Sequence, residues 1–303
     1  AYGMEVRWHG RGGQGVVTAS HLLAAAALLD GKHLLSLPEF GAERAGAPVV
    51  AYTRISDGPV TQRGSITHPH IVIVLDATLL GRVDVTAGLR PGGSLLLNTP
   101  LPPEEAVKAV PLRLITVYTV DATRIALQTL RRSIPNLPLL GALARVNPVV
   151  SLDSLRKAMH GFLGHRLGSE ALQANQEALA LGYEMVKGPA LAPQEPLSTP
   201  PTEAPLPPWQ EMPLGALVLQ AGNSVEVETG SWRSLRPVVE WEKCVHCMLC
   251  WLFCPDACFV AQDGRLVAVD YQHCKGCGIC QVECPKACIR MVPEGPLVGA
   301  GGG

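Results

Sequence analysis

The chain has 303 residues, of which 47% are hydrophobic and 17% are charged, and its net charge is −1. This length is typical of two domains, and the near-neutral charge argues against nucleic-acid binding. The longest apolar run near the start, Leu22–Leu29, is too short to cross a bilayer and follows a polar glycine-rich loop. We therefore expect a cytoplasmic protein with no membrane anchor and no signal peptide.

Residues 1–187 are expected to form a Rossmann-like α/β domain. A strand at Met4–Trp8 leads into the glycine-rich His9–Gly15, and the Ala- and Leu-rich Val16–Leu29 that follows is typical of a helix. Five further apolar runs bounded by Gly, Pro or Asp have the pattern of buried strands in a mostly parallel sheet: Leu34–Leu37, Val49–Ile55, Ile71–Leu75, Ser94–Leu97 and Leu114–Val117. Later helices are predicted at Asp121–Arg132, Leu152–Phe162 and Ser169–Met185, the last with Ser169 as its N-cap.

The glycine loop is the first candidate site. Its residues Gly10, Gly12, Gly13 and Gly15 stand between a strand and a helix, and three of them fit the spacing G-x-G-x-x-G. A helix N-terminus behind glycines can bind anions, and Glu39 stands about where a ribose-binding acid would be. Dinucleotide binding is one interpretation; a tight turn with close helix packing is the other. The motif alone does not decide between them.

Residues 188–214 are expected to be a linker, because Pro189–Pro213 contains nine prolines and favours extended conformations over helix or central strand. In Gly215–Val239 the alternation of polar residues (Ser224, Glu226, Glu228) suggests a strand that enters a last domain, 215–303. The tail Gly299–Gly303 is expected to be disordered.

All ten cysteines lie in the last domain, between Cys244 and Cys288, and they form an internal repeat. Each half has the run C-x2-C-x2-C-x3-C-P, and the second half follows the first after 30 residues. Crowding of this kind points to metal or clusters, because the cysteines of a secreted disulfide scaffold would be spread along a short chain. Two equivalent sites are therefore expected.

The run is that of bacterial ferredoxins, in which three cysteines hold one [4Fe–4S] cluster and the fourth ligates the other. The interpretation is an α+β ferredoxin-like domain with two clusters. Zinc is the alternative, but a tandem of four cysteines followed by Pro is not a zinc-ribbon pattern. We assign cluster 1 to Cys244, Cys247, Cys250 and Cys284, and cluster 2 to Cys274, Cys277, Cys280 and Cys254.

Several residues near these ligands have weaker assignments. Cys258 and Cys288 lie four residues after a ligand and are expected to be buried thiols without a metal. Gly276 and Gly278 would let the backbone approach the sulfurs and donate N–H bonds. His246 is expected to be a solvated surface residue, although a pH-dependent effect on its cluster stays open.

Three segments resemble the gamma subunit of 2-oxoacid:ferredoxin oxidoreductases. They are Gly10–Ala19 (GRGGQGVVTA), Leu37–Pro48 and the strand Ile71–Asp76 that ends in Asp. The second departs from the family pattern because Ala45 precedes Gly46 at a turn that is usually richer in glycine. The cysteine repeat is similar to the delta subunit of the same enzymes, so the order along the chain resembles a fused gamma–delta subunit.

The resemblance implies an electron-transfer and scaffold subunit of an EC 1.2.7-type complex that is not catalytic alone. Thiamine diphosphate and Mg²⁺ would lie on partner alpha and beta subunits, with coenzyme A where the family uses it. Electrons would pass through both clusters to soluble ferredoxin, in an anaerobe, within a dimer of heterotrimers. Pyruvate, 2-oxoglutarate, indolepyruvate, branched-chain oxoacids and oxalate remain open as substrates. The alternatives are an NAD(P)H-linked iron–sulfur reductase that uses the glycine loop, and a simple two-cluster carrier.

Overall fold

A computed structural model describes residues 3–39, 46–80, 82–110, 115–165, 167–191, 209–211, 215, 217 and 219–294. The chain divides into two compact units, Ala1–Glu195 with Val292–Gly303, and Pro196–Met291. We describe each unit by itself. Among the described residues, no helix has the length and apolar character needed to cross a membrane. The expected disorder of the glycine tail falls outside the described residues.

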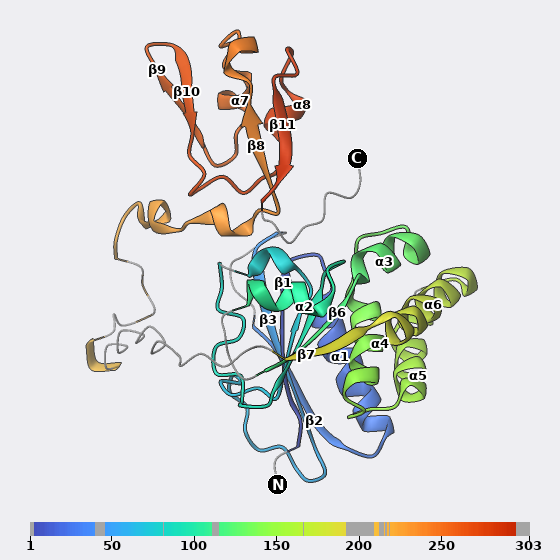
Figure 1. Cartoon of the computed structure of the whole chain (residues 1–303). Coiled ribbons are helices and arrows are strands. Elements are labelled where there is room, and N and C mark those ends of the chain that lie inside the picture. Colours follow the sequence, from blue (N-terminus) through green and yellow to red (C-terminus); the bar gives the residue numbers. More distant parts are fainter. Residues whose placement is uncertain are drawn as a thin grey trace. The chain divides into compact units, whose positions relative to one another are not determined.

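The first unit is built on a seven-stranded mixed sheet with the order β2-β3-β1-β4-β5-β6-β7 (Figure 1). Its strands are β1 Glu5–Arg11, β2 His33–Pro38, β3 Pro48–Ser56, β4 Ile71–Val74, β5 Ser94–Asn98, β6 Thr116–Val120 and β7 Lys187–Leu191. Four neighbours, β1, β4, β5 and β6, run parallel, and β3 and β7 flank them antiparallel. This confirms the predicted α/β domain with its mostly parallel centre.

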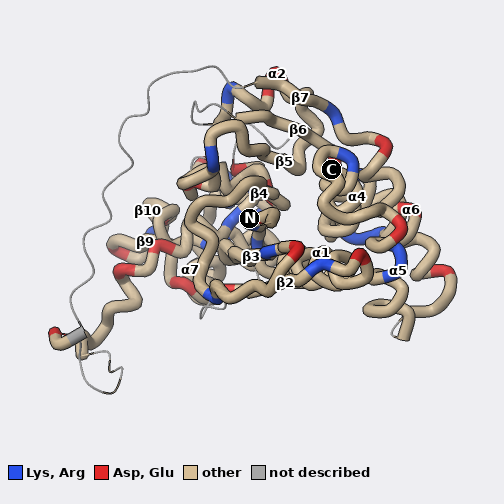
Figure 2. The backbone as a smooth tube through the Cα atoms, turned by 90° about the horizontal axis from the view of Figure 1, so that it is seen from below, with Lys and Arg blue, Asp and Glu red and all other residues tan. Residues whose placement is uncertain are grey.

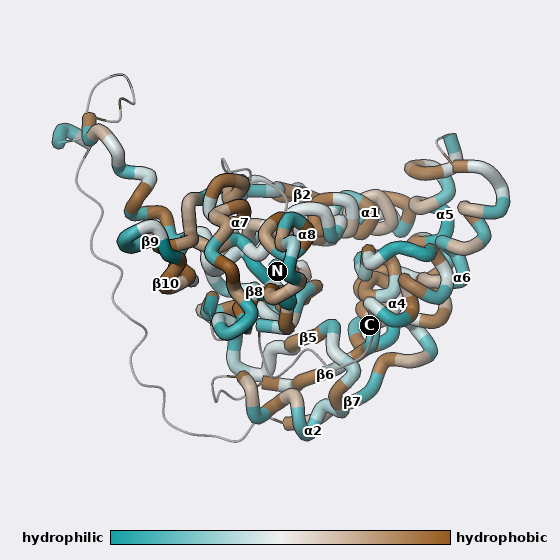
Figure 3. The backbone as a smooth tube through the Cα atoms, turned by 90° about the horizontal axis from the view of Figure 1, so that it is seen from above, coloured by the Kyte–Doolittle hydropathy of each residue, from teal (hydrophilic) through white to brown (hydrophobic). Residues whose placement is uncertain are grey.

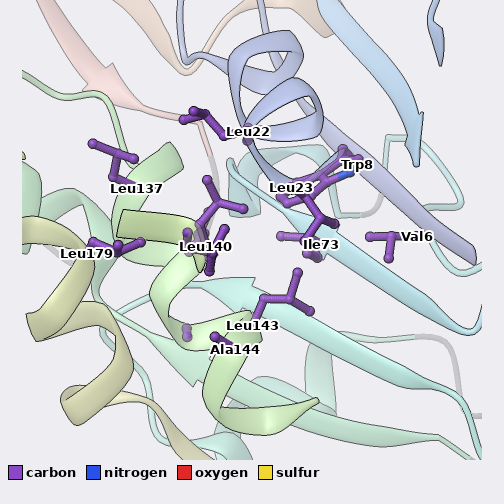
Figure 4. Packing of buried hydrophobic residues seen from close by; sticks show 14 of the residues in the cluster. Val6, Trp8, Leu22, Leu23, Ile73, Leu137, Leu140, Leu143, Ala144 and Leu179 are labelled. Carbon is purple, nitrogen blue, oxygen red and sulfur yellow. The ribbon is translucent and has the colours of Figure 1, made fainter. Parts of the chain in front are cut away.

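One face of the sheet packs against helices. These are α1 Val16–Leu29, α3 Ala122–Leu130, α4 Asn136–Val146, α5 Leu152–Leu163 and α6 Ser169–Met185. Figure 4 shows the centre of this core, where leucines of α1 and α4 lie over Trp8 and Ile73 of the sheet. The α4–α6 contact is close because of two glycines. A Cβ on Gly141 would lie 1.9 Å from the Leu179 carbonyl oxygen, and one on Gly182 would lie 2.0 Å from that of Pro138.

The other face is covered by residues between β4 and β6, including the short helix α2 Pro103–Ala106. Neighbouring positions on β4 point to opposite faces: Ile73 joins the helical side and Val72 and Val74 join this second core. Burial on both faces explains why the central strands are continuous apolar runs. Figure 2 marks the basic and acidic residues along the backbone of this unit, and both signs are present.

Several elements differ from the sequence-based expectation. Strand β1 runs on to Arg11, because pairing with β3 continues through Gly10 and Arg11, so the first three of the seven residues of the expected loop are strand. Helix α4 was not predicted at all. Strand β7 lies at the start of the segment 188–214 expected to be a linker, and most of the rest of that segment lies outside the described residues. The N-cap of α6 is Gly168 and not Ser169.

In the second unit the order strand, short helix, strand occurs twice. Its elements are β8 Leu235–Val239, α7 Leu249–Leu252, β9 Phe259–Gln262, β10 Arg265–Val269, α8 Ile279–Val282 and β11 Ile289–Pro293. Strand β8 pairs with β11, and β9 pairs with β10. The alternation in Gly215–Val239 was misread as a strand, since Asn223–Glu226 forms a 3-10 helix and the strand begins only at Leu235.

Candidate metal-binding site and glycine loop

The 30-residue repeat of the sequence is also a repeat of backbone conformation. Strand β10 begins 30 residues after β8, α8 after α7 and β11 after β9. Positive φ angles recur in the same way, in the pairs His246 and Gly276, Met248 and Gly278, and Ala257 and Ala287. The left-handed residues turn the chain between successive cysteines. The two halves therefore build two equivalent cysteine loops.

Each loop lines a cavity, and each cavity also takes two cysteines from the other half. Cavity 1 is lined by Cys244, Cys247, Cys250 and Cys284, together with Cys288. Cavity 2 is lined by Cys274, Cys277, Cys280 and Cys254, together with Cys258. The fold thus brings together the same two sets of four thiols that the spacing indicated.

The thiols differ in exposure around each cavity. Cys250 and Cys280 are buried, whereas Cys247 and Cys277 are exposed at the surface. Burial raises the pKa of Cys250 to about 11 and that of Cys280 to about 12. Burial also raises the pKa of Cys274, against the opposing effects of the Gly276 N–H and the Arg233 charge. Since metals bind the thiolate, loading of these cavities must release protons.

Backbone N–H groups point to some of the sulfurs. The His246 N–H donates to Cys244 Sγ at 3.4 Å, and the Cys258 N–H donates to Cys254 Sγ at 3.3 Å. Gly276 also has a packing role, because a Cβ there would lie 2.1 Å from the Leu235 carbonyl oxygen. Such N–H groups favour the thiolate and its complexes.

The remaining thiols, Cys258 and Cys288, are 1% and 3% exposed. Cys288 Sγ lies 3.4 Å from Cys284 Sγ, and Cys258 lines cavity 2. Each is thus a fifth thiol in the wall of a cavity that already has four.

His246 is not the free surface residue that the sequence suggested. It is half-buried, its Nδ1 accepts from the Leu266 N–H at 3.2 Å, and its Nε2 lies 3.3 Å from an Arg265 nitrogen. The imidazole therefore ties the first cysteine loop to β10. No sequence pattern identified these partners, because the hairpin brings them together from 20 residues away.

The glycine loop is fastened to the end of β4 by polar side chains. Arg11 is 3% exposed, its Nε lies 3.2 Å from Asp76 Oδ2, and its Nη2 donates to Thr78 Oγ1 at 2.8 Å. Gln14 Nε2 donates to Asp76 Oδ2 at 2.7 Å, and Gln14 Oε1 accepts from the Arg11 N–H at 2.8 Å. The sequence analysis singled out Asp76 and the glycines, but not this role for Arg11 and Gln14.

Two of the four loop glycines are needed for packing. A Cβ on Gly10 would lie 2.5 Å from Val16 Cγ2, and one on Gly15 would lie 2.5 Å from Asn136 Nδ2. Gly12 donates its N–H to the Ala47 carbonyl at 2.9 Å. Gly13 is exposed and has no atom within 4 Å of its Cβ position. These contacts favour the interpretation of a tight turn with close helix packing.

The sheet order also speaks against the dinucleotide interpretation. In a Rossmann site the ribose-binding acid follows the strand next to β1. Here β3 lies between β1 and β2 and runs antiparallel to β1. Glu39, at the end of β2, is therefore two strands away, and its carboxylate accepts from Ser65 Oγ at 2.9 Å.

An open hollow lies at the opposite end of β1, beside Met4. Its charged groups serve the fold. The Asp30 carboxylate accepts from the Ser151 N–H at 3.0 Å, and Lys32 pairs with Asp57. We assign it no chemistry.

The first unit is similar to known proteins over most of its length. The family model described as pyruvate ferredoxin/flavodoxin oxidoreductase matches residues 5–185. The pyruvate/ketoisovalerate oxidoreductases common subunit gamma of Thermococcus litoralis is 44% identical over 175 residues, which cover 58% of this chain and 95% of that protein. The NADH-dependent phenylglyoxylate dehydrogenase subunit gamma of Aromatoleum evansii is 43% identical over 182 residues, 60% of this chain and 93% of that protein.

A crystal structure agrees with these sequence matches. Pyruvate oxidoreductase subunit PORC from Thermotoga maritima is 42% identical and has a TM-score of 0.55, covering 61% of this chain and 97% of that one. The matched family segment ends at residue 185, so the cysteine repeat lies beyond it.

Proposed function

Because the chain belongs to the pyruvate ferredoxin/flavodoxin oxidoreductase family, we propose that it is the electron-transfer and scaffold subunit of a thiamine-diphosphate-dependent 2-oxoacid:ferredoxin oxidoreductase. In this proposal the first unit is a gamma-type domain and the second is a fused delta-type ferredoxin domain that holds two [4Fe–4S] clusters. The domains are 1–187 and 215–303, with 188–214 as the connection. Thiamine diphosphate, Mg²⁺ and the carbon chemistry belong to partner alpha and beta subunits.

The observation that carries the proposal is the pair of cavities with exchanged fourth cysteines. Each cavity is lined by the four thiols that a [4Fe–4S] cluster takes as ligands. Zinc would need four ligands converging on one point. Within the described part of the chain, no three His, Cys, Asp or Glu side chains are close enough to hold a single metal ion. The arrangement therefore supports clusters over zinc.

The residues of the chain would do three things for such clusters. Cys244, Cys247, Cys250 and Cys284 would hold cluster 1, and Cys274, Cys277, Cys280 and Cys254 would hold cluster 2. Apolar neighbours such as Phe259 and Leu266 exclude water from the inner sides of the cavities. N–H groups stabilise the negative sulfurs. When bound, the clusters supply one-electron carriers of low potential.

Partner surfaces are available on the second unit. Helix α7 and part of α8 are strongly hydrophobic (Figure 3), and Trp251, Leu252, Phe253 and Val282 are exposed. Exposed apolar side chains beside the cysteine loops support docking of other subunits, as expected for a complex. We propose alpha and beta subunits as stable partners, soluble ferredoxin as the acceptor, and a dimer of heterotrimers.

The test is anaerobic purification of the full chain with its co-purifying subunits. We expect about eight irons and eight sulfides per chain, a partner with bound thiamine diphosphate, and reduction of ferredoxin by one 2-oxoacid. Assays with pyruvate, 2-oxoglutarate and oxalate, each with and without coenzyme A, would identify the substrate class. A chain that binds zinc, or that purifies without any thiamine-containing partner, would refute the proposal.

An NAD(P)H-linked reductase is the second candidate, and the name of the Aromatoleum evansii relative is the observation in its favour. The separation of β2 from β1 and the filled Cβ positions of Gly10 and Gly15 argue against a nucleotide on this chain. Bleaching of the clusters of the isolated chain by NADH would reverse this ranking.

A further inference from the structure

The two halves of the second unit differ in one buried charge. One ion pair is repeated, because Glu240–Lys243 before the first loop corresponds to Asp270–His273 before the second. Arg233, two residues before β8, corresponds to Asp263, two residues before β10. Asp263 is exposed at a hairpin turn, whereas Arg233 is 6% exposed. Arg233 is thus a buried charge with no buried counterpart in the other half of the repeat.

Arg233 is built into the wall of the second cysteine loop. Its Nη1 donates to the carbonyl oxygens of Tyr271 and Cys274, the latter at 3.0 Å. Its guanidinium carbon lies 5.5 Å from the centre of the Tyr271 ring. Gly230 leaves room for it, since a Cβ there would lie 2.8 Å from Arg233 Nη1. The charge is therefore fixed at the first ligand of cluster 2 and shielded from water.

The other charges at the two cavities are weaker sources of asymmetry. At cavity 2, Lys275 pairs with Asp256 at 3.3 Å, so their charges largely cancel. At cavity 1, Lys286 is exposed, and water and salt screen its charge. A charge in the low-dielectric interior acts more strongly over the same distance. Arg233 is thus the main electrostatic difference between the cavities.

We propose that Arg233 is a positioning residue that holds the reduction potential of cluster 2 above that of cluster 1, which makes cluster 2 the exit for electrons. Reduction adds one negative charge to a cluster, and a buried guanidinium beside Cys274 stabilises that charge. One electron then passes from cluster 1, which is oxidised, to cluster 2, which is reduced, with no bond made or broken. This inference rests on the proposed function, because it assumes two clusters.

The test is an anaerobic potentiometric titration of the full-length protein, followed by EPR. The exposed ligand variant Cys277→Ser assigns the signal of cluster 2. In the unaltered protein, cluster 2 must have the higher potential. Arg233→Gln should lower the potential of cluster 2 alone, by enough to shift the electron distribution between the clusters about tenfold, or about 59 mV for one electron. Arg233→Lys, which keeps the charge, should retain most of the difference.

Arg236 provides the matched control. Its guanidinium also lies over the Tyr271 ring, at 5.6 Å, but its side chain is exposed. Arg236→Gln should leave both potentials unchanged. Equal shifts of both clusters in Arg233→Gln, no shift, or a lower potential for cluster 2 in the unaltered protein would overturn the inference. If Arg233→Gln loses a cluster, the order of potentials in the unaltered protein decides. Failure to find two clusters in that protein would instead defeat the proposed function.

Discussion

Gln14 Nε2 donates a hydrogen bond to Asp76 Oδ2 across 2.7 Å and so joins the glycine loop to a strand end 62 residues away. The same carboxylate faces the buried Arg11 guanidinium at 3.2 Å. The loop is therefore held by a buried charge pair together with its hydrogen bonds. Arg11, Gln14 and Asp76 thus act together to hold the glycine loop against the end of β4.

Removing the carboxylate should be costly. Asp76→Ala removes the carboxylate that faces the buried Arg11 guanidinium, so we expect a loss of about 3–5 kcal/mol of unfolding free energy. Urea unfolding monitored by circular dichroism at the helix band would measure it, because the long helices all belong to the first unit. Asp153→Ala is the control, since the Asp153–Lys157 pair on α5 is exposed and should contribute about 0.5 kcal/mol or less. Equal losses in the two variants would contradict this account of the loop.

The loop glycines should differ in their tolerance of a side chain. Gly15 and Gly13 both have positive φ, at 81° and 96°, so alanine strains the backbone at either position. Only at Gly15 would the new methyl also meet Asn136. We expect Gly13→Ala to cost about 1 kcal/mol and Gly15→Ala to cost about 1–2 kcal/mol more, measured by the same urea unfolding. If Gly13→Ala were the more damaging, the exposed glycine would have a role that packing does not explain.

The sequence predicted those parts of the fold that depend on local pattern. Helices α1 and α6 are long runs of good helix formers, and their bounds were correct. Helix α4 was missed because Pro138 and Gly141, both unfavourable inside helices, interrupt it. Strand β7 was missed because its Gly and Pro residues are unfavourable in strands, and pairing with β6 overrides that preference.

The candidate sites, too, could be predicted only in part from the sequence. Cysteine spacing indicated two sets of four thiols, since the repeat fixes the loop geometry within each half. The partners of Gly15 and the place of Arg233 beside Cys274 depend on tertiary contacts between distant segments. No spacing rule contains that information. The same holds for His246, whose ring partners come from the following hairpin.

The exchange of fourth ligands gives a selective prediction. Cys254→Ala should damage cluster 2, whose other ligands begin at Cys274, and leave cluster 1 in place, because Cys254 lines only cavity 2. EPR of the reduced protein and iron content would report which cluster is lost. Cys258→Ala is the control, four residues away, and should keep both clusters. Loss of cluster 1 in Cys254→Ala would refute the crossed assignment, and loss of a cluster in Cys258→Ala would identify that thiol as a ligand.

A buried histidine should make the first unit sensitive to mild acid. His9 is 6% exposed, and its Nε2 accepts from Arg7 Nε at 3.0 Å. Burial, with the Arg7 charge, lowers the pKa of His9 from its ordinary value of 6.5 to about 3. The unfolded chain therefore binds a proton between these values that the folded chain does not.

It follows that the stabilising effect of neutral His9 is complete above pH 6.5 and is lost progressively as the pH falls towards 3. Between about pH 8 and about pH 6 we expect His9 to account for a loss of about 0.8 kcal/mol of unfolding free energy. His70, whose pKa burial also lowers, should add to the loss in the same direction. Urea unfolding at both pH values should show a smaller pH dependence in His9→Gln, whereas the exposed His165→Gln should keep that of the unaltered protein. An undiminished dependence in His9→Gln would show that another group binds the proton on unfolding.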